Sequence, residues 1–428
     1  MFVSKIYKYF YRKYFMKFEV LKGTKDFLPK EQIKINEVLD IIREGFEGYG
    51  FRPLDTPLIE YFDTLAMKYD SSAEIVQEIF KVTDRGEREL GLRYDLTTPL
   101  CRFIAENNKS LKKPFRRYQI GKVFRDGPIK AGRLREFIQC DGDVIGVSGI
   151  EIEAELLIMF FETYKKLGID AIIEINNNKI LRGAFLQNGF KEKDLSSLIL
   201  SVDKLKKIGE KGVLDEIKEK GFEVKSAKSA IEILSSKDFS KIEKLAKDEL
   251  LIQGINELNL LANLIKPYVN FRVNFSMSRG LDIYTGNIWE SYDKAEKISS
   301  SIGSGGRYDK VISEYMNSTE EMPAVGVSFG LIPILECLKN ENSKEGVSEI
   351  LVVPLEENLV SVCFKIAQEY RKKGKKVEMF YGYKIKKAFE YAEFLGCEEV
   401  IILGKKDVEN KEYTLKNIVS GKEEKVKF

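Results

Sequence analysis

The densest group of side chains that could do chemistry lies in residues 115–146. Two segments there, FRRYQIGKVFRD and LREFIQCDGDVIG, alternate polar and apolar residues around a Gly- and Pro-containing connection, which predicts a long antiparallel hairpin. Its candidate residues are Arg116, Arg117, Arg125, Arg133, Arg135, Gln139, Asp141 and Asp143. Strand alternation puts the last three on one face, in phase with Arg133 and Arg135. Such a face suits a substrate that is anionic at one end and cationic at the other, as ATP with an amino acid would be; a solvated face with ion pairs is the alternative.

Weaker candidates lie in three other segments. In SRGLDIYTG, the glycine after Arg279 allows close backbone approach and Asp282 could orient the guanidinium, although an ordinary Arg–Asp pair is the alternative. Asp95 and Thr97 in LRYDLTTP could bind an ammonium group or cap the helix that follows. The segment GSGGRYD (303–309) is neither a G-x-G-x-x-G nor a Walker A sequence, so a glycine-rich bulge in a strand is expected there.

The composition excludes several kinds of chemistry. The 428 residues include no histidine, so neither a Ser-His-Asp or Cys-His nucleophile nor a His-ligated zinc site can form. The five cysteines are scattered without a C-x-x-C motif, which excludes a disulfide scaffold or zinc ribbon and fits a reducing cytosol. Because the net charge is only +3, any basic face must be local. Chemistry must depend on Arg, Lys, carboxylates and bound ions, for which phosphoryl and nucleotidyl transfer are natural candidates.

Elements that could position these residues follow from the hydrophobic pattern. Helical spacing is found from Gln32 to Phe46 and in residues 150–167, and a short strand followed by a helix is expected at 90–104. Residues 179–266 are rich in Lys, Glu and Ser with helical periodicity, which predicts an inserted helical domain. Strand patterns return at 271–292 and around GSGGRYD, and PAVGVSFGLIPILECL (323–338) predicts a buried strand that leads into a helix.

Both ends of the chain differ from its centre. Beyond a polar linker at 339–348, strand and helix patterns alternate as βαβαβ, which predicts a small separate sheet domain at 346–428. Residues 1–18 carry five basic residues and no acid, which suits a membrane-surface or nucleic-acid arm; a disordered extension or a true start at Met16 is the alternative. Since no run approaches the ~20 apolar residues of a membrane span, we expect a cytoplasmic protein without a membrane partner.

The order of the motifs resembles that of the histidyl-tRNA synthetase family. The matching segments are KGTKDFLP, FRPLDTPLIEY, LRYDLTTPLCRFIA, RRYQIGKVFRDGPIKAGRLREFIQCDGDVIG, SRGLDIYTGNIWE, GSGGRYD and PAVGVSFG, within residues 22–335. Residues 346–428 resemble the family's anticodon-binding domain, and RYDLT and QCDGD resemble its archaeal and eukaryotic branch. The resemblance implies an α+β fold: a class II catalytic domain at 19–338, with an antiparallel sheet flanked by helices and the insertion at 179–266, and a C-terminal α/β anticodon-binding domain.

The activity that the resemblance implies is histidine–tRNA ligation. The enzyme would activate L-histidine with ATP to histidyl-adenylate and transfer the histidyl group to the 3′ end of tRNA(His). A second copy would complete a homodimer, with Pro57 at the interface. Mg²⁺ would accompany ATP, and no metal bound by the protein itself, zinc included, is expected.

Nine residues are carried over from the family's motifs. Arg125 and Arg279 are expected to be catalytic, on either side of the α-phosphate. The other substrate-binding residues are Asp95, Leu96, Thr97, Gln139, Asp143, Ile283 and Tyr284. Asp95, Thr97 and Gln139 would bind the amino group of histidine. Asp143 and Tyr284 would hold the imidazole.

Three departures from the family's pattern concern its phosphate and histidine contacts. Pro333 stands where the third motif has an arginine, RDGP (125–128) lacks the usual acid–arginine pair, and Ile283 replaces a tyrosine. Two alternatives from other functional classes remain: the synthetase-like regulatory subunit of ATP phosphoribosyltransferase, which normally lacks a domain like 346–428, and a non-catalytic tRNA-binding paralogue. The retained Arg125, Gln139 and Arg279 argue against the second.

Overall fold

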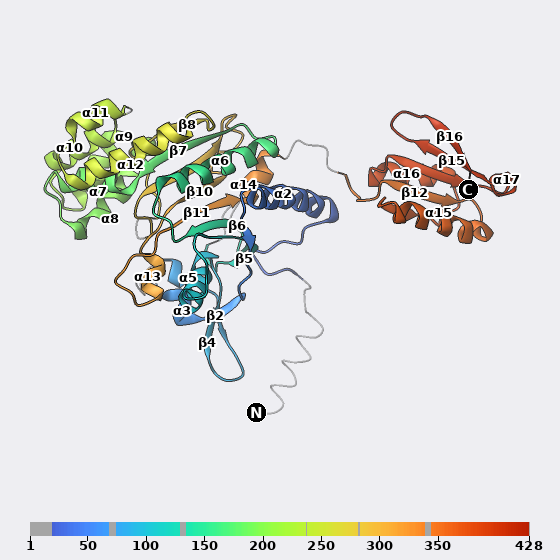
Figure 1. Ribbon diagram of the computed structural model, residues 1–428, viewed down its shortest axis with the longest axis horizontal. Helices are drawn as coiled ribbons and strands as arrows, with labels where there is room; N and C mark the ends of the chain where they lie inside the picture. Colours follow the sequence, from blue (N-terminus) through green and yellow to red (C-terminus); the bar gives the residue numbers. More distant parts are fainter. Residues whose placement is uncertain are drawn as a thin grey trace. The chain divides into compact units, whose positions relative to one another are not determined.

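The computed structural model describes residues 19–67, 74–128, 134–236, 238–280, 283–338 and 344–427 (Figure 1). These residues divide into two units, one formed by 19–25 and 38–338, the other by 26–37 and 344–427. The hypothesis of a basic N-terminal arm concerns residues 1–18, which lie outside the described ranges.

An eight-stranded sheet organises the first unit. Its order is β1 (Arg52–Pro53), β5 (Phe115–Phe124), β6 (Glu136–Ile145), β11 (Ala324–Gly330), β10 (Gly303–Arg307), β9 (Asn287–Asp293), β7 (Ala171–Asn177) and β8 (Phe271–Val273). Neighbouring strands are antiparallel except for the outermost pairs, β1–β5 and β7–β8. Strands β5 and β6 pair from Phe115↔Ile145 to Phe124↔Glu136, which confirms the predicted hairpin.

One face of this sheet packs against α6 (Ile150–Lys166) and against the part of α2 (Pro29–Gly48) that belongs to the same unit, residues 38–48. The ring of Phe46 stacks on Tyr118 at a centroid distance of 5.4 Å and meets Phe329 at 5.5 Å, while Phe160 meets Phe329 at 4.4 Å. These rings are large and buried, so they supply much of the apolar area that holds the layers together. Because strand residues alternate, the neighbours of Phe329 point to the opposite face.

GSGGRYD forms part of the sheet rather than a bulge. Residues 303–307 make the regular strand β10, which pairs without interruption from Gly303↔Phe329 to Arg307↔Val325, so the expectation of a bulge was wrong. Its glycines have a packing cause. A Cβ at Gly305 would lie 2.6 Å from the Trp289 Nε1, and one at Gly303 would overlap the Tyr164 hydroxyl.

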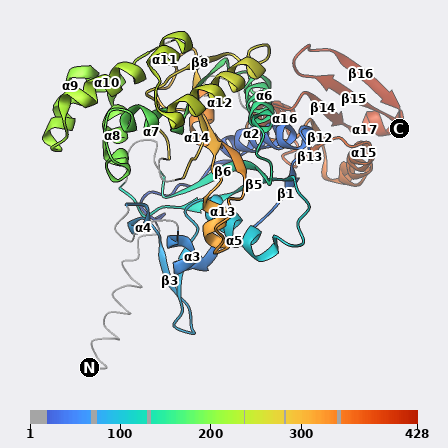
Figure 2. The same cartoon turned by 60° about the vertical axis from the view of Figure 1, so that its left-hand side comes forward.

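Helices and a small sheet surround the two ends of the large sheet (Figures 1 and 2). The three-stranded sheet β2 (Ile59–Tyr61), β4 (Glu89–Leu92) and β3 (Lys81–Thr83) lies with α3 (Phe62–Ala66), α5 (Thr97–Asn107) and α13 (Val311–Tyr315). At the β7–β8 end, the chain from 178 to 265 is helical: α7 (Asn178–Leu186), α8 (Leu195–Val202), α9 (Leu205–Glu219), α10 (Val224–Leu234), α11 (Phe239–Leu245) and α12 (Glu249–Ile265). The predicted start of a helix at Thr97 is confirmed.

The second unit contains a five-stranded sheet of order β13 (Val377–Met379), β12 (Ile350–Pro354), β14 (Glu399–Leu403), β15 (Glu412–Asn417) and β16 (Glu423–Lys427). The first three strands are parallel, with α15 (Val360–Lys372) and α16 (Ile385–Leu395) as crossovers, and the last two add antiparallel neighbours. The βαβαβ prediction and the α+β class are both confirmed. No helix of the described residues is long and apolar enough to cross a membrane.

Candidate active site

Seven neighbouring strands place a polar residue at the same level of the large sheet, on the face opposite Phe329. In order across the sheet these residues are Arg272, Glu174, Glu290, Ser304, Ser328, Asp141 and Gln119. We call them the polar row. Residues directly opposite in paired strands share a face, so the row forms a band of hydrophilic side chains over the middle of the sheet. The candidate site lies on this band.

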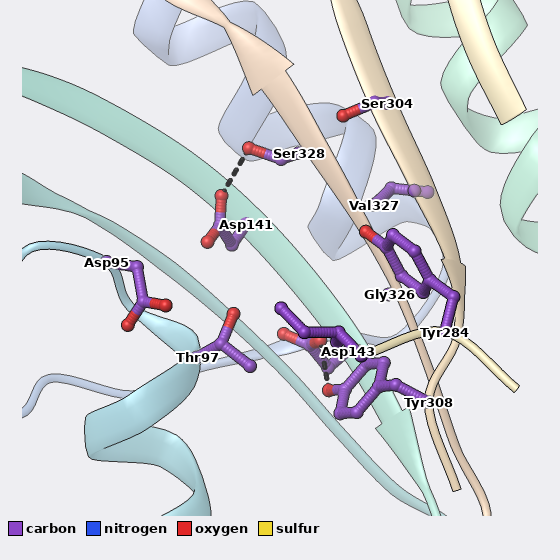
Figure 3. A pocket seen from close by; sticks show the side chains of 12 residues that line it. Asp95, Thr97, Asp141, Asp143, Tyr284, Ser304, Tyr308, Gly326, Val327 and Ser328 are labelled. Carbon is purple, nitrogen blue, oxygen red and sulfur yellow. Dashed lines mark hydrogen bonds between the residues drawn. The ribbon is translucent and has the colours of Figure 1, made fainter. Parts of the chain in front are cut away.

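A cavity of about 80 Å³ opens at the centre of the polar row (Figure 3). It is lined by Asp95, Thr97, Asp141, Asp143, Ile283, Tyr284, Ser304, Gly305, Tyr308, Gly326, Val327 and Ser328. Five of these were expected in the site: Asp95, Thr97, Asp143, Ile283 and Tyr284. The structure therefore brings together residues from five separate segments around three carboxylates. We call this space the acidic cavity.

Asp143 is held in place by a buried cation and a buried phenol. Its Oδ2 lies 2.6 Å from Nη2 of Arg117, and the Tyr308 hydroxyl donates a hydrogen bond to its Oδ1. Burial raises the pKa of Asp143, and the charge of Arg117 opposes that rise. Gly326 lies opposite Asp143 on β11, and a Cβ there would overlap the Asp143 carboxylate, so only glycine leaves room for this arrangement.

Asp141 lies on the same strand, two residues away from Asp143. The hydroxyl of Ser328 donates a 2.6 Å hydrogen bond to its Oδ1. Burial raises the pKa of Asp141 to about 7, and the nearby charges of Asp143 and Asp95 act in the same direction while Arg117 opposes them. This carboxyl therefore changes its charge near neutral pH.

Asp95 and Thr97 reach the acidic cavity from the start of α5. The carboxylate of Asp95 accepts a 2.9 Å hydrogen bond from the backbone N–H of Thr98, which satisfies one of the helix's free donors. Ligand binding and helix capping, proposed as alternatives for this segment, are thus compatible. Leu96 lies between them with its side chain fully buried, and it is not among the residues that line the cavity.

A second cavity, of about 250 Å³, adjoins the acidic cavity, and Ser328 lines both. Its walls include Arg125, Phe137 and Gln139 from the hairpin and Pro333 from α14 (Leu331–Cys337). The Arg125 guanidinium lies 5.1 Å from the centre of the Phe137 ring, and its Nε donates to the backbone oxygen of Tyr94 at 3.1 Å. We call this space the arginine cavity.

Arg279 lines neither cavity. Its guanidinium is about half exposed and forms an ion pair with Glu290, which is 3% exposed and also accepts a 2.7 Å hydrogen bond from the Tyr292 hydroxyl. Burial disfavours the charged guanidinium, but the Glu290 carboxylate outweighs it and the pKa of Arg279 is raised. Asp282, the partner proposed for Arg279, lies outside the described residues. Since Glu290 is opposite Ser304, Arg279 is attached one strand away from the acidic cavity.

Several lining residues were missed by the sequence analysis. Asp141 was recognised as in phase with Asp143 but was not assigned a role, and Tyr308 sits in GSGGRYD, which was interpreted only as backbone. Gly326 and Ser328 alternate in PAVGVSFG, a pattern that signals one strand face. Arg117 was among the charged candidates of the hairpin, but its burial and its pairing with Asp143 were not predicted, because they depend on the register of the two strands.

Comparison with known proteins identifies the family. The model of histidyl-tRNA synthetase matches residues 23–334, and that of the anticodon binding domain matches residues 349–428. The chain belongs to the histidyl-tRNA synthetase family. Histidine–tRNA ligase 1 of Bacillus cereus (strain ATCC 14579) is 38% identical over 419 residues, covering 96% of this chain and 98% of the relative. Histidine–tRNA ligase 2 of Shouchella clausii is 39% identical over 422 residues, with the same coverage.

Solved structures agree with this assignment. The crystal structure of histidyl-tRNA synthetase from Nostoc sp. PCC 7120 has a TM-score of 0.85 at 28% identity, covering 96% of this chain and 97% of that one. An ATP phosphoribosyltransferase regulatory subunit/histidyl-tRNA synthetase from Bacillus halodurans has a TM-score of 0.76 at 19% identity, which shows a shared fold alone. The relatives named here are bacterial, so they lend no support to the expected archaeal and eukaryotic branch.

Proposed function

We propose that this chain activates L-histidine with ATP to form histidyl-adenylate and then transfers the histidyl group to the 3′ end of tRNA(His). The activity, histidine–tRNA ligation, follows from membership of the family over nearly the whole chain. The observation that carries the assignment of the site is the pair of adjoining cavities, one lined by three carboxylates and the other by Arg125. A cationic amino acid and an anionic nucleotide would be bound side by side there.

The acidic cavity suits the histidine ring. The Asp143 carboxylate can accept a hydrogen bond from one ring nitrogen, and the Tyr284 hydroxyl, which points into the cavity in Figure 3, can serve the other. A site that hydrogen-bonds both ring nitrogens would discriminate against amino acids of similar bulk, because these would leave buried polar groups of the protein unpaired. Asp95 and Thr97 are placed to bind the amino group. Ile283 would form part of the pocket wall, and the buried Leu96 would pack behind Asp95 and Thr97.

The chemistry needs charge stabilisation rather than a protein base. The histidine carboxylate attacks the α-phosphorus of ATP, a new P–O bond forms, and the bond to pyrophosphate breaks. Negative charge spreads over the equatorial oxygens, and we assign its neutralisation to Arg125 from the arginine cavity and to Arg279, which pairs with Glu290 of the polar row. The terminal hydroxyl of tRNA then attacks the carbonyl carbon and releases AMP.

ATP binding is proposed to use the arginine cavity. Gln139, which the family resemblance assigns to the amino group of histidine, also lines it, and its Oε1 is buried without a hydrogen-bond partner among the described residues. Pro333 lines this cavity where the family has an arginine, so one phosphate contact must be made in another way. No three acidic or cysteine side chains in the described ranges gather as a metal site. Mg²⁺ would therefore enter with the nucleotide phosphates.

The remaining assignments concern domains and partners. We propose that residues 19–338 form the catalytic domain with 179–266 as its insertion, that 346–428 bind the anticodon of tRNA(His), and that the enzyme works in the cytoplasm. A homodimer is supported by exposed apolar side chains that follow Pro57 in the sequence. These are Leu58, Ile59, Tyr61 and Met67, between 44% and 56% exposed. A second copy at this interface would cover such side chains.

Histidine-dependent exchange of pyrophosphate into ATP tests the first step, and charging of tRNA(His) tests the second. We expect both, with histidine alone of the common amino acids supporting exchange. Exchange with a different amino acid would overturn the substrate. Absence of both reactions from a folded protein would favour the regulatory-subunit or tRNA-binding alternatives.

A further inference from the structure

Asp141 is a carboxylate of the acidic cavity that forms no ion pair within the described residues, although the charge of Arg117 acts on it from a distance. It is 6% exposed, and that exposure is toward the cavity it lines. Its partner among the described residues is the neutral hydroxyl of Ser328, and none of the ion pairs of the described residues includes it. Burying an ionised carboxylate without a cation is costly unless a ligand brings the opposite charge.

The neighbouring carboxylates differ from Asp141 in this respect. Asp143 is paired with the fully buried Arg117 and accepts from Tyr308. Asp95 accepts a hydrogen bond from the backbone N–H of Thr98 and lies just before the N-terminus of α5, where the helix dipole favours negative charge. The acidic cavity therefore has more negative than positive charge, and Asp141 contributes to that excess.

The position of Asp141 corresponds to the middle of an amino acid that spans both cavities. Its hydrogen-bond donor Ser328 is the residue that lines the acidic cavity and the arginine cavity together. If the side chain of the substrate occupies the acidic cavity beside Asp143 and its carboxylate reaches toward Arg125, then the α-carbon lies at the junction. The ammonium group is one bond from that carbon.

We propose that Asp141 binds the α-ammonium group of the amino-acid substrate, an inference that rests on the proposed function. An ammonium has three N–H donors. Asp95, Thr97 and Asp141, which line one cavity, supply one acceptor each. Gln139, to which the family resemblance gave the third contact, lines the adjoining arginine cavity, so Asp141 is the further acceptor that lies in the acidic cavity itself.

The test varies one charged group on the protein and one on the ligand. Binding of three ligands to the full-length enzyme is measured by calorimetry: L-histidine, L-histidinol, which keeps the ammonium but lacks the carboxylate, and imidazolepropionate, which keeps the carboxylate but lacks the ammonium. Asp141→Asn preserves the size of the side chain. We expect it to weaken L-histidine and L-histidinol by about 10- to 100-fold, as for loss of a hydrogen bond to a charged group, and to leave imidazolepropionate unchanged within about twofold.

Asp143→Asn is the comparison variant, because all three ligands contain the ring and it should weaken all three alike. Equal weakening of all three ligands by Asp141→Asn would overturn the proposal in favour of a role at the ring or in the fold. No weakening of any ligand would overturn it as well. Asp141→Ser provides a second neutral variant if the asparagine does not fold. Failure of the proposed function would show differently, as wild-type enzyme without histidine-dependent exchange.

Discussion

Arg279 and Glu290 form an ion pair in which only one member is accessible. The carboxylate is almost fully buried between Glu174 and Ser304 in the polar row, whereas the guanidinium is about half exposed. A buried carboxylate with a second bond from Tyr292 is a fixed anchor. It holds Nη2 of the guanidinium, so the half-exposed side chain can offer its other nitrogens to a ligand.

Arg279→Ala is expected to slow adenylate formation by about 100- to 1,000-fold, the effect of removing one preorganised donor to a transition-state oxyanion. Histidine binding should be largely retained, because the guanidinium acts on charge that develops during the reaction. Single-turnover adenylation and calorimetry separate the two effects. Unchanged exchange kinetics would show that Arg279 has no part in the chemistry.

A matched control for this variant lies at the far end of the polar row. Arg272 is also about half exposed and pairs with a buried carboxylate, but that carboxylate, Glu174, lies two strands from Ser304 of the acidic cavity, whereas Glu290 lies next to it. Arg272→Ala should leave adenylation within about twofold, because the guanidinium is too far from the cavities to act on the substrate. Equal losses in the two variants would point to the stability of the row rather than to catalysis.

Asp143→Ala should raise the Michaelis constant for histidine by about 10- to 100-fold and that for ATP far less, because the lost hydrogen bond is to the ring. It should also lower the free energy of unfolding by about 3–5 kcal/mol, since Arg117 would be left buried and unpaired. Exchange kinetics with each substrate varied, and thermal melting, measure the two effects. A variant with wild-type dependence on histidine would reduce Asp143 to a structural partner of Arg117.

Gly326→Ala should distort the acidic cavity without changing any polar group. The added methyl group would overlap the Asp143 carboxylate and lie 3.3 Å from the Gly142 oxygen, so we expect a loss of about 1–3 kcal/mol in the free energy of unfolding and weaker histidine binding. Gly48→Ala is the control, because a Cβ there has nothing within 4 Å. If both variants melt and bind alike, the fit between Gly326 and Asp143 does not limit the pocket.

Much of the fold could be predicted because local patterns specify it. The hairpin 115–146, the helix from Thr97 and the βαβαβ order all follow from alternation, periodicity and turn residues. The site was harder, because its contacts cross the sheet. Glu290 meets Arg279 through strand order rather than through spacing, and Arg117 is buried only because Asp143 faces it. The glycines of β10 were misinterpreted because their reason, close packing against Trp289 and Tyr164, lies on neighbouring elements.

Deletion of residues 346–428 tests the division of labour between the two units. We expect the truncated protein to form histidyl-adenylate at near wild-type rates but to charge tRNA(His) poorly, because the residues of both cavities lie between 95 and 333. Exchange and charging assays on the same preparation separate the two activities. Loss of adenylate formation from a protein that still melts cooperatively would contradict this modular arrangement.

The charge of Asp141 should make histidine binding depend on pH. Its pKa of about 7 in the free enzyme lies above the ordinary carboxyl value, and the charged groups around it are Arg117, Arg93, Asp143 and Asp95. Only the ionised form can neutralise an ammonium. The ratio of histidine affinities, wild type over Asp141→Asn, should therefore rise as pH increases through about 7. Titration of the histidine ring is common to both proteins and cancels in the ratio.

Stability should change in the opposite direction over the same range. Because the folded pKa exceeds the unfolded one, the folded state holds a proton that the unfolded state has released between about pH 4 and 7, so the free energy of unfolding falls as pH rises. Asp141→Asn lacks the titrating carboxyl, so its free energy of unfolding should not fall with pH in this way. Above pH 7 the variant should therefore gain stability relative to the wild type. Denaturant titrations from pH 5 to 8 measure it. Parallel curves for the two proteins would mean that Asp141 titrates as an ordinary carboxyl, and the affinity ratio would then be flat across neutral pH.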